Sequence, residues 1–340
     1  MSHTGRETLA VILAAGKGTR MKSDLPKVLH TLLGKPLVSF VIDACRGAGV
    51  SRTMLVIGHM AELVKATLGS AIEYTIQTEQ LGTGHALMTA AEQLGDDYKG
   101  DVLVLVGDAP FLSAEVIKAL VDKHQQSQAS ATMMTAIMDP PPAYGRIVRD
   151  NEGRVLRIVE ERDATPEEKK ITEVNTSHYI FRSEDVFPLL KALSTDNDQG
   201  EYYLTDVIEM LAEKQASIET LTEDDPDMLK GINDRAQLVE AEAALKAKKI
   251  QALRAQDVII PDAGQIYIEA DVTVGSGSTL YPFTSLLGQT RIGESCVIGP
   301  QTTLRDTVLG HRCRVEASVI ENRRFTDDEI IGPFAAMRGE

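Results

Sequence analysis

The segment Leu9-Ala10-Val11-Ile12-Leu13-Ala14-Ala15-Gly16-Lys17-Gly18-Thr19-Arg20-Met21, followed by Pro26-Lys27-Val28, decides the fold. Its first five residues are apolar and predict a buried strand. Two glycines then let the backbone approach a polyanion closely, and the cationic side chains of Lys17, Arg20 and Lys27 can neutralise phosphate charge. A strand that runs into such a loop is typical of the start of an α/β domain that handles phosphate.

The spacing of the glycines excludes two common phosphate-binding motifs. A Walker A loop requires Gly-x4-Gly-Lys-Ser/Thr, and Gly16 and Gly18 are too close together for that pattern. A dinucleotide fingerprint requires Gly-x-Gly-x-x-Gly, and Met21 occupies the place of the third glycine. A glycine-rich surface turn with incidental charges remains the alternative interpretation of this loop.

Strand-like and helix-like segments alternate as far as about residue 225, because short apolar runs predict strands and helical spacing of apolar residues predicts helices. The predicted strands are Leu9–Leu13, Thr53–Ile57, Tyr74–Gln77, Val102–Val106 and Ala131–Met138, and the predicted helices are Pro36–Ala48, Ala61–Leu68, His85–Leu94 and Ala114–His124. This alternation predicts an α/β fold with a Rossmann-like, mostly parallel sheet covered on both faces. Ligands bind such sheets beyond the carboxyl ends of the strands.

The middle of the chain predicts an antiparallel insertion in this sheet. Tyr144–Arg149 and Arg154–Glu160 flank a polar turn and predict a β-hairpin. Further elements are a strand at Ser177–Arg182, helices at Asp185–Leu193 and Tyr203–Lys214, and a long helix at Asp234–Ala255. An insertion of this kind often forms a wall or lid beside a binding site.

The C-terminal part of the chain is a repeat. Aliphatic residues recur at a strict spacing of six, at Ile268, Val274, Leu280, Leu286, Ile292, Ile298 and Leu304. This period is the signature of a parallel β-helix, in which each coil buries an aliphatic side chain against the next. The register slips near Leu309-Gly310 and resumes at Val315, Val319 and Ile331. We therefore expect a first domain over 1–234, a linker helix over 235–256 and a hexapeptide-repeat domain over 257–340.

Composition limits the classes of function. The chain has 340 residues, no Trp, 4% aromatic residues, and 35 basic against 50 acidic residues, which gives a formal net charge of −15. An acidic surface with few aromatics argues against nucleic-acid binding. The three cysteines are too few and too widely spaced for a disulfide framework or a zinc cluster. The polar N-terminus and the lack of a long apolar run predict no membrane segment and a cytoplasmic protein.

Five motifs distributed along the chain carry a family resemblance. They are Leu13–Met21 with Pro26-Lys27-Val28-Leu29, Gln77-Thr78-Glu79-Gln80-Leu81-Gly82-Thr83-Gly84-His85-Ala86, Gly107-Asp108, Tyr144-Gly145-Arg146 and Gly200-Glu201-Tyr202-Tyr203-Leu204-Thr205-Asp206. With these motifs the chain resembles the N-acetylglucosamine-1-phosphate uridylyltransferases, which join UTP and N-acetylglucosamine 1-phosphate into UDP-N-acetylglucosamine and pyrophosphate. The glycine loop alone marks the wider sugar nucleotidyltransferases, whereas the second and fifth motifs are more specific.

The resemblance, together with the chemistry of the side chains, assigns the substrate-binding residues. Arg20 and Lys27 are the expected catalytic pair, because nucleotidyl transfer requires charge neutralisation at the phosphates. The backbone of Leu13, Ala14, Ala15 and Gly16 is expected at the nucleotide, and Gln77, Gln80, Gly82 and Thr83 at the uracil. For the sugar the resemblance implies Gly145, Glu160 and Asn175. From the residues alone, Glu160 also fits a surface charge of the hairpin, and His85 fits a structural role.

The resemblance also implies Mg²⁺ as the cofactor. Asp108 ends an apolar strand, where a carboxylate is costly unless it is paired or binds a cation. The resemblance adds Asn233 as the second protein ligand and as a substrate-binding residue, although Asn233 alone fits a helix N-cap. The other expected partners are further copies of the chain in a trimer formed by a short left-handed β-helix.

Several features depart from the family or leave alternatives open. Val106 stands where an aromatic residue is common, and Ser177 stands where the family usually has glycine. The family's acetyl-transfer residues lie mainly beyond Glu340, so we expect no acetyltransferase activity from this chain. The remaining alternatives are transfer of uridylyl or thymidylyl to another sugar 1-phosphate, and a non-catalytic subunit that binds nucleotide sugars.

Overall fold

The computed structural model describes residues 6–339 and divides into two compact units, which we treat separately. The first unit comprises the chain up to Leu29 together with Leu37–Asn233, and the second comprises His30–Pro36 together with the chain from Asp234 onward. Residues 1–5 of the polar N-terminal segment lie outside the described residues. Within the described part of the chain, every helix is too short or too polar to cross a bilayer.

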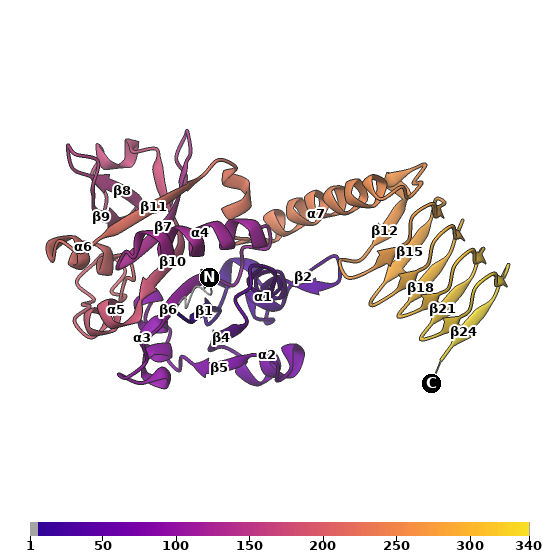
Figure 1. Ribbon diagram of the computed structural model, residues 1–340, viewed down its shortest axis with the longest axis horizontal. Coiled ribbons are helices and arrows are strands. Elements are labelled where there is room, and N and C mark those ends of the chain that lie inside the picture. Colours follow the sequence, from indigo (N-terminus) through magenta and orange to yellow (C-terminus); the bar gives the residue numbers. More distant parts are fainter. Residues whose placement is uncertain (1–5, 340) are drawn as a thin grey trace. The chain divides into compact units, whose positions relative to one another are not determined.

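A nine-stranded sheet forms the centre of the first unit, and its main strands lie in the order β11-β7-β10-β6-β1-β4-β5 (Figure 1). The strands are β1 (Thr8–Leu13), β4 (Arg52–Ile57), β5 (Glu73–Ile76), β6 (Asp101–Val106), β7 (Ala131–Ile137), β8 (Arg146–Arg149), β9 (Val155–Val159), β10 (Glu173–Arg182) and β11 (Ile218–Glu223). β1 pairs in parallel with β4 and β6, whereas β10 is antiparallel to both β6 and β7. The β8–β9 hairpin joins the sheet through β10.

Helices cover both faces of this sheet, because successive residues of a strand point to opposite sides. The helices are α1 (Leu37–Gly47), α2 (Ala61–Leu68), α3 (Thr83–Leu94), α4 (Ala114–Ser127), α5 (Ser183–Leu190) and α6 (Asp206–Glu213). On β1, Ala10 and Ile12 belong to the core shared with α1, α2 and α4, whereas Leu9 and Val11 belong to the core shared with α3, α5 and α6. The predicted α/β fold with a mostly parallel sheet and an antiparallel insertion is confirmed.

Two strands of this sheet differ from the sequence-based prediction. The edge strand β11 was not predicted, because Ile218–Glu223 has only two apolar residues, Ile218 and Leu221, which neither alternate with polar residues nor form an apolar run, and its side chains are mostly half-buried. β10 begins at Glu173 rather than at Ser177. Its first residues include the polar Asn175 and Thr176, which the sheet nevertheless buries. Both errors arise because tertiary pairing, and not local hydrophobicity, places these residues in strands.

The second unit begins with a short hairpin, β2 (Thr31–Leu32) and β3 (Lys35–Pro36), and continues with the long helix α7 (Arg235–Ala255). Leu33 and Gly34 form the hairpin turn with positive φ angles of 46° and 77°. The Ala270 N–H donates to the Leu33 carbonyl at 2.9 Å. This hairpin was not recognised from the sequence, since two residues per strand carry no periodicity.

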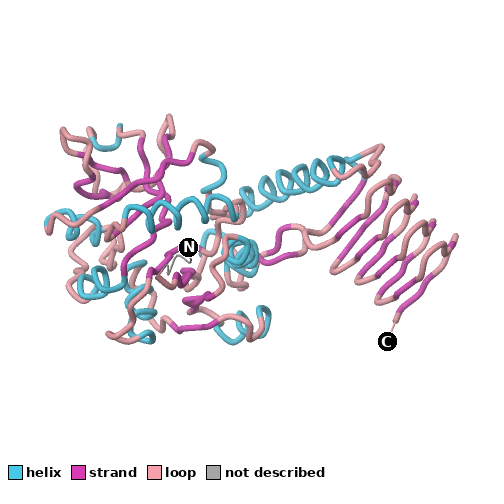
Figure 2. The backbone as a smooth tube through the Cα atoms, viewed as in Figure 1, coloured by secondary structure: helices cyan, strands magenta, loops and turns pink. Residues whose placement is uncertain are grey.

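The coils of the second unit form three parallel sheets, visible as stacked strands in Figures 1 and 2. One sheet is β12 (Ile266–Ile268), β15 (Thr284–Leu287), β18 (Thr303–Arg305), β21 (Val319–Glu321) and β24 (Ala336–Arg338). The second is β13 (Thr273–Val274), β16 (Arg291–Ile292), β19 (Val308–Leu309) and β22 (Arg324–Phe325), and the third is β14 (Thr279–Leu280), β17 (Val297–Ile298), β20 (Arg314–Val315) and β23 (Ile330–Ile331). The predicted left-handed parallel β-helix is confirmed as a fold.

The aliphatic repeat occupies the interior of the β-helix. All seven aliphatic residues at the strict spacing of six are at most 5% exposed. One expectation is wrong: Val319 is 46% exposed, and Ile320 is the buried residue that stacks on Leu304. The spacing between inward residues is one residue shorter than six from Leu304 to Leu309 and again from Val315 to Ile320. The buried position is therefore Ile320 and not Val319.

Candidate active site

The loop that follows β1 is held against its own strand and against the segment that follows it. The Ala14 N–H donates to the Val56 carbonyl at 2.9 Å, which extends the β1–β4 ladder into the loop. Gly18 has a φ of 61°, and a Cβ there would lie 2.6 Å from Lys27 Cβ, so only glycine fits. Met21 is fully buried and anchors the loop. Backbone hydrogen bonding, close packing and a buried side chain therefore fix the conformation of this loop.

Asp108 lies beside this loop because the neighbouring strand ends there. The Gly107 N–H donates to the Leu13 carbonyl at 3.0 Å, which ties the end of β6 to the end of β1. The Asp108 carboxylate forms an ion pair with the Lys27 ammonium, and both side chains are largely buried. The sequence-predicted cation and carboxylate therefore meet at the carboxyl edge of the sheet.

Asn233 completes this charged network from the far end of the first unit. Its Oδ1 accepts hydrogen bonds from Arg20 Nη2 and from Lys27 Nζ, both at 2.8 Å. The alternative interpretation of Asn233 as a helix N-cap is wrong, because Asp234 caps α7 by accepting from the Gln237 N–H. Solvated loop charges were the alternative for Arg20 and Lys27; this alternative does not fit Lys27, which is largely buried, whereas Arg20 is exposed.

A glycine brings the Asn233 segment close to Asp108. The Ile232 N–H donates to the Asp108 carbonyl at 2.9 Å. A Cβ on Gly231 would lie 2.9 Å from Asp108 Oδ1, so a side chain at this position would press against the carboxylate. Gly231 therefore permits the approach that places Asn233 and Asp108 around one ammonium group.

The two most specific sequence motifs are hydrogen-bonded to each other. The Tyr202 N–H donates to the Leu81 carbonyl, and the Gly84 N–H donates to the Tyr202 carbonyl, both at 2.8 Å. Gly82 has a φ of 107°, and a Cβ there would lie 2.6 Å from the Tyr202 oxygen. The Leu204 N–H donates to the Thr83 hydroxyl. These contacts explain physically why the motifs occur together.

The amide of Gln77 is fixed inside this arrangement. Gln77 is 3% exposed, and its Nε2 lies 3.2 Å from the Gly82 carbonyl and 2.9 Å from His85 Nδ1. Gln80 Nε2 donates in turn to the Gln77 carbonyl at 3.2 Å. His85 thus orients an amide, in keeping with the structural role expected for it. A rigid amide group is suited to reading the edge of a planar heterocycle.

Polar groups on the other side of Asp108 come from the antiparallel insertion. The Asn175 N–H donates to the Gly145 carbonyl at 2.8 Å, and Glu160 accepts from the Thr205 hydroxyl at 3.2 Å. Burial raises the pKa of Glu160, the Thr205 hydroxyl opposes this, and the carboxylates of Asp163 and Asp206 raise the pKa further. Glu160 is therefore not the surface charge that the sequence also allowed.

The structure gathers the predicted site residues in two hollows of the first unit. The loop hollow, about 370 Å³, holds Leu13, Ala14, Ala15, Gly16, Arg20, Lys27, Gln77, Gln80, Gly82, Thr83 and Asp108. The hairpin hollow, about 230 Å³, holds Asp108, Gly145, Glu160, Asn175 and Asn233. Val106 and Asp108 line both hollows, so the two hollows adjoin at the end of β6.

Several residues that line these hollows were not predicted as site residues. Those with polar side chains are Thr19 and Glu201 in the loop hollow and Tyr144, Thr176 and Ser177 in the hairpin hollow. Glu201 and Tyr144 belong to two of the motifs that carried the family resemblance, and this membership could have identified them as site residues. For Ser177 the available signal was its place at a position where the family usually has glycine, whereas Thr176 had no signal, because its inclusion follows from the course of β10.

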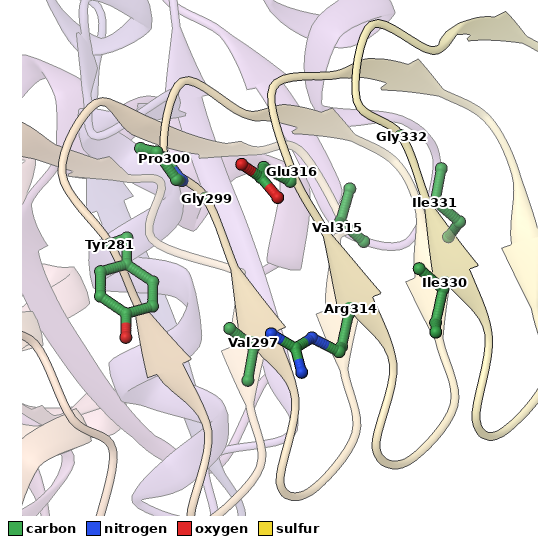
Figure 3. Close-up of a pocket in the computed structure, with 10 residues that line it drawn as sticks. All are labelled: Tyr281, Val297, Gly299, Pro300, Arg314, Val315, Glu316, Ile330, Ile331 and Gly332. Atoms are coloured by element: carbon green, nitrogen blue, oxygen red, sulfur yellow. The ribbon is translucent and has the colours of Figure 1, made fainter.

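A further hollow lies on the coils of the second unit (Figure 3). Its lining mixes aliphatic side chains with Tyr281, Arg314 and Glu316, and Figure 3 shows the Arg314 guanidinium directed toward Val297 of the adjacent coil. None of the predicted site residues lines this hollow. Within residues 6–339 no cluster of three or more His, Cys, Asp or Glu side chains could hold a metal ion by itself.

Comparisons with known proteins agree with this geometry. Residues 9–227 match the family described as Nucleotidyl transferase. The chain is 45% identical to the bifunctional protein GlmU of Halalkalibacterium halodurans over 97% of this chain and 72% of that protein. It is 44% identical to the GlmU protein of an Exiguobacterium species over 98% and 73%, and 43% identical to that of Syntrophomonas wolfei over 97% and 74%.

A solved structure shares the fold at lower identity. The crystal structure of a protein described as a glucose-1-phosphate thymidylyltransferase from Bacillus anthracis superposes with a TM-score of 0.56 at 21% identity, covering 70% of this chain and 94% of that one. This likeness supports the architecture of the fold alone. The family match and the relatives together show that the chain belongs to the nucleotidyl transferase family, among the GlmU proteins.

Proposed function

We propose that the chain transfers a uridylyl group from UTP to N-acetylglucosamine 1-phosphate, giving UDP-N-acetylglucosamine and pyrophosphate. A phosphate oxygen of the sugar phosphate forms a bond to the α-phosphorus of UTP. The bond between that phosphorus and the oxygen leading to the β-phosphate breaks, and pyrophosphate leaves. The observation that carries the proposal is that two polar hollows adjoin at Asp108, within reach of Arg20 and Lys27.

This chemistry needs charge neutralisation rather than a general base. The second pKa of a phosphate monoester is about 6, so the sugar phosphate is already ionised at neutral pH. The protein must hold two polyanions in line and balance the charge that grows on the leaving pyrophosphate. We assign this role to Arg20 and Lys27, whose side chains line the loop hollow. The backbone of Leu13, Ala14, Ala15 and Gly16 would lie along the nucleotide.

The two hollows would receive the two halves of the product. We assign the uracil to Gln77, Gln80, Gly82 and Thr83, because a fixed amide and backbone groups can match its two acceptors and one donor. We assign the sugar to Gly145, Glu160 and Asn175, because buried carboxylate and amide groups suit sugar hydroxyls. The hydrogen bonds that fix Gln77 and Asn175 support these assignments.

The residues around Asp108 fit Mg²⁺. The Asp108 carboxylate and the Asn233 Oδ1 both contact the Lys27 ammonium, so these two oxygens already converge on one cation. Mg²⁺ prefers oxygen ligands and is usually held by one or two carboxylates together with substrate phosphates. Asp108 and Asn233 would hold the ion. When bound, it would supply Lewis-acid stabilisation of phosphate charge.

Assembly into a trimer is the other part of the proposal. The coils expose large apolar side chains, among them Phe283 at 61%, Ile330 at 78% and Phe334 at 86%. Exposed apolar patches of this kind are typical of protein–protein interfaces. Light scattering should give three times the 37.0 kDa of one chain, and Ile330→Asp should lower that mass. A wild-type mass of one chain would contradict the trimer.

The experiment that tests the activity is pyrophosphate release by the purified chain with UTP, Mg²⁺ and a panel of sugar 1-phosphates. We expect kcat/KM to favour N-acetylglucosamine 1-phosphate over glucose 1-phosphate by at least about 10²-fold, and chelation of the metal to abolish turnover. A preference for glucose 1-phosphate, or for dTTP over UTP, would overturn the substrate assignment. Binding of UDP-N-acetylglucosamine without any turnover would indicate a non-catalytic subunit instead.

A further inference from the structure

Ser177 has an unusual backbone conformation inside a β-strand. Its φ is 60°, in the left-handed region that favours glycine. The other non-glycine residues with positive φ in the described part of the first unit are Lys22, Met60, Gln128 and Gln215, and these lie at the ends of helices. Ser177 instead lies within β10, where the pairing of β10 with β7 shifts register between Asn175 and Tyr179.

The bulge at Ser177 is held by hydrogen bonds to buried partners. The Ser177 N–H donates to Asn175 Oδ1 at 3.2 Å, and Asn175 Nδ2 donates to Tyr179 Oη at 2.7 Å. Asn175 is 4% exposed and Tyr179 is 2% exposed. Burial raises the pKa of Tyr179, the Glu160 charge adds to this, and hydrogen bonds from Asn175 and Ser177 oppose it. The backbone of the bulge is therefore anchored to the buried Asn175 and Tyr179 pair.

The same bulge places Ser177 in the lining of the hairpin hollow, together with Glu160 and Asn175. Glycine would adopt this φ without a steric penalty, so serine brings backbone strain that glycine would avoid. What serine adds is a hydroxyl group, which can both donate and accept a hydrogen bond. Strain that persists at the wall of a polar hollow indicates that this hydroxyl has a use there.

We propose that Ser177 determines specificity for the sugar phosphate, because its strained bulge presents a hydroxyl that hydrogen-bonds a hydroxyl of the sugar ring. This assignment rests on the proposed function and extends the sugar-binding group beyond Gly145, Glu160 and Asn175. Val106, at the end of β6, also lines the hollow but offers no polar group. A hydrogen bond to Ser177 therefore adds a polar contact on the side of the hollow that β10 forms.

Two variants separate the hydroxyl from the backbone strain. Ser177→Ala removes the hydroxyl and keeps a Cβ in the strained position, whereas Ser177→Gly removes both. We expect each variant to raise the KM for N-acetylglucosamine 1-phosphate by about 5- to 10-fold, since one hydrogen bond to a substrate is lost. The KM for UTP should stay within about twofold of wild type, because the uracil-side contacts are untouched. Ser177→Gly should also raise the melting temperature by about 2–4 °C.

A matched control tests whether relief of strain alone changes the kinetics. Gln128→Gly also relieves a left-handed residue, at the C-terminal end of α4 and outside both hollows. It should raise stability and leave both KM values unchanged. Monodeoxy analogues of the sugar phosphate sharpen the assignment: the analogue that lacks the contacted hydroxyl should bind wild type and Ser177→Ala equally well.

The outcomes distinguish this inference from the proposed function. If wild type turns over UTP and the sugar phosphate but both Ser177 variants keep the wild-type KM, the assignment of Ser177 is wrong and the proposed function stands. A rise in the KM for UTP equal to that for the sugar phosphate would also overturn it, by indicating general distortion. If wild type shows no turnover with any sugar phosphate, the proposed function fails, and the assignment fails with it.

Discussion

The two units bury their apolar residues by different rules. In the β-helix, Ile268, Leu286 and Leu304 occupy the same place on successive coils, so one position in the period determines burial everywhere. In the first unit the alternation along β1 serves two separate cores and stops at Leu13, where the loop begins. The charged and polar side chains of the candidate site lie beyond Leu13, where the alternation of β1 ends. A repeat supplies packing area, whereas a site needs positions at which regular structure is interrupted.

The same contrast holds for left-handed backbone. Ser295, Arg312 and Asp328 have φ values of 56°, 58° and 64° at equivalent corners of successive coils, where the repeat itself requires a turn. Ser177 has a φ of 60° within a strand of the first unit. In the coils this conformation has an architectural role, and in β10 we attribute it to function. Each of the following changes tests whether chemistry and stability are divided between the units in this way.

The largest effect is expected from Asp108→Asn in the first unit. We expect kcat to fall by at least about 10³-fold, equivalent to about 4 kcal/mol, because the substitution removes the charge that faces Lys27 and the proposed metal ion. Pyrophosphate release at saturating substrates measures the change. Asp122→Asn is the control, since this carboxylate pairs with Lys118 on the exposed face of α4. If Asp108→Asn keeps more than a tenth of wild-type turnover, Asp108 has another role.

A stability effect of comparable size is expected in the β-helix. Leu304→Ala removes a fully buried side chain and should lower the free energy of unfolding by about 2–5 kcal/mol, measured by denaturant titration. Folded protein should retain the wild-type kcat, because the coils contribute none of the proposed site residues. Val319→Ala, at a half-exposed position, should change stability by less than about 0.5 kcal/mol. Equal losses in the two variants would argue against the inward position of Ile320.

The smallest effect concerns a carboxyl group near the hairpin hollow. Burial, with the charges of Glu209 and Asp163, raises the pKa of Asp206 to about 6 from 3.8. The folded state holds this proton more tightly than the unfolded chain, so the stabilisation is complete below about pH 4 and is lost as the pH rises through about 6.

Asp206→Asn does not titrate, so it should be more stable than wild type at pH 7.5 and not at pH 4. Asp206 is only partly buried, so solvent screening reduces the effect to about 1 kcal/mol, or about 2–4 °C in the melting temperature. Thermal unfolding at the two pH values measures the difference between the variants. A difference that does not change with pH would show that Asp206 titrates normally in the folded protein.

Local periodicity explains most of what could be predicted. The apolar run before Gly16 identified β1, and helical spacing identified α1 and α4, because burial on one or two faces imposes a period on the sequence. The spacing of six identified the coils for the same reason. Prediction failed where this periodicity weakened. Ile218–Glu223 has too few apolar residues to indicate β11, and a shortened repeat led to Val319 being predicted as buried in place of Ile320.

The candidate site could be predicted in its residue types but not in its contacts. The glycine loop and the resemblance identified Arg20, Lys27 and Asp108, but nothing local indicated that one ammonium group contacts both Asp108 and Asn233. The close approach allowed by Gly231 could not be predicted, and the replacement of the usual glycine by Ser177 marked a position without indicating the bulge there. These features depend on segments that are far apart in the sequence.

The sequence by itself determined most of the strands and helices, the burial rule of the coils and the chemical character of the loop, since each follows from side chains within a few residues of one another. Only the tertiary structure decided which polar groups meet and which residues of β10 turn toward the hairpin hollow. The physical reason is that sheet pairing brings distant strand ends together, and the free energy of burying a polar group depends on partners that only this pairing supplies.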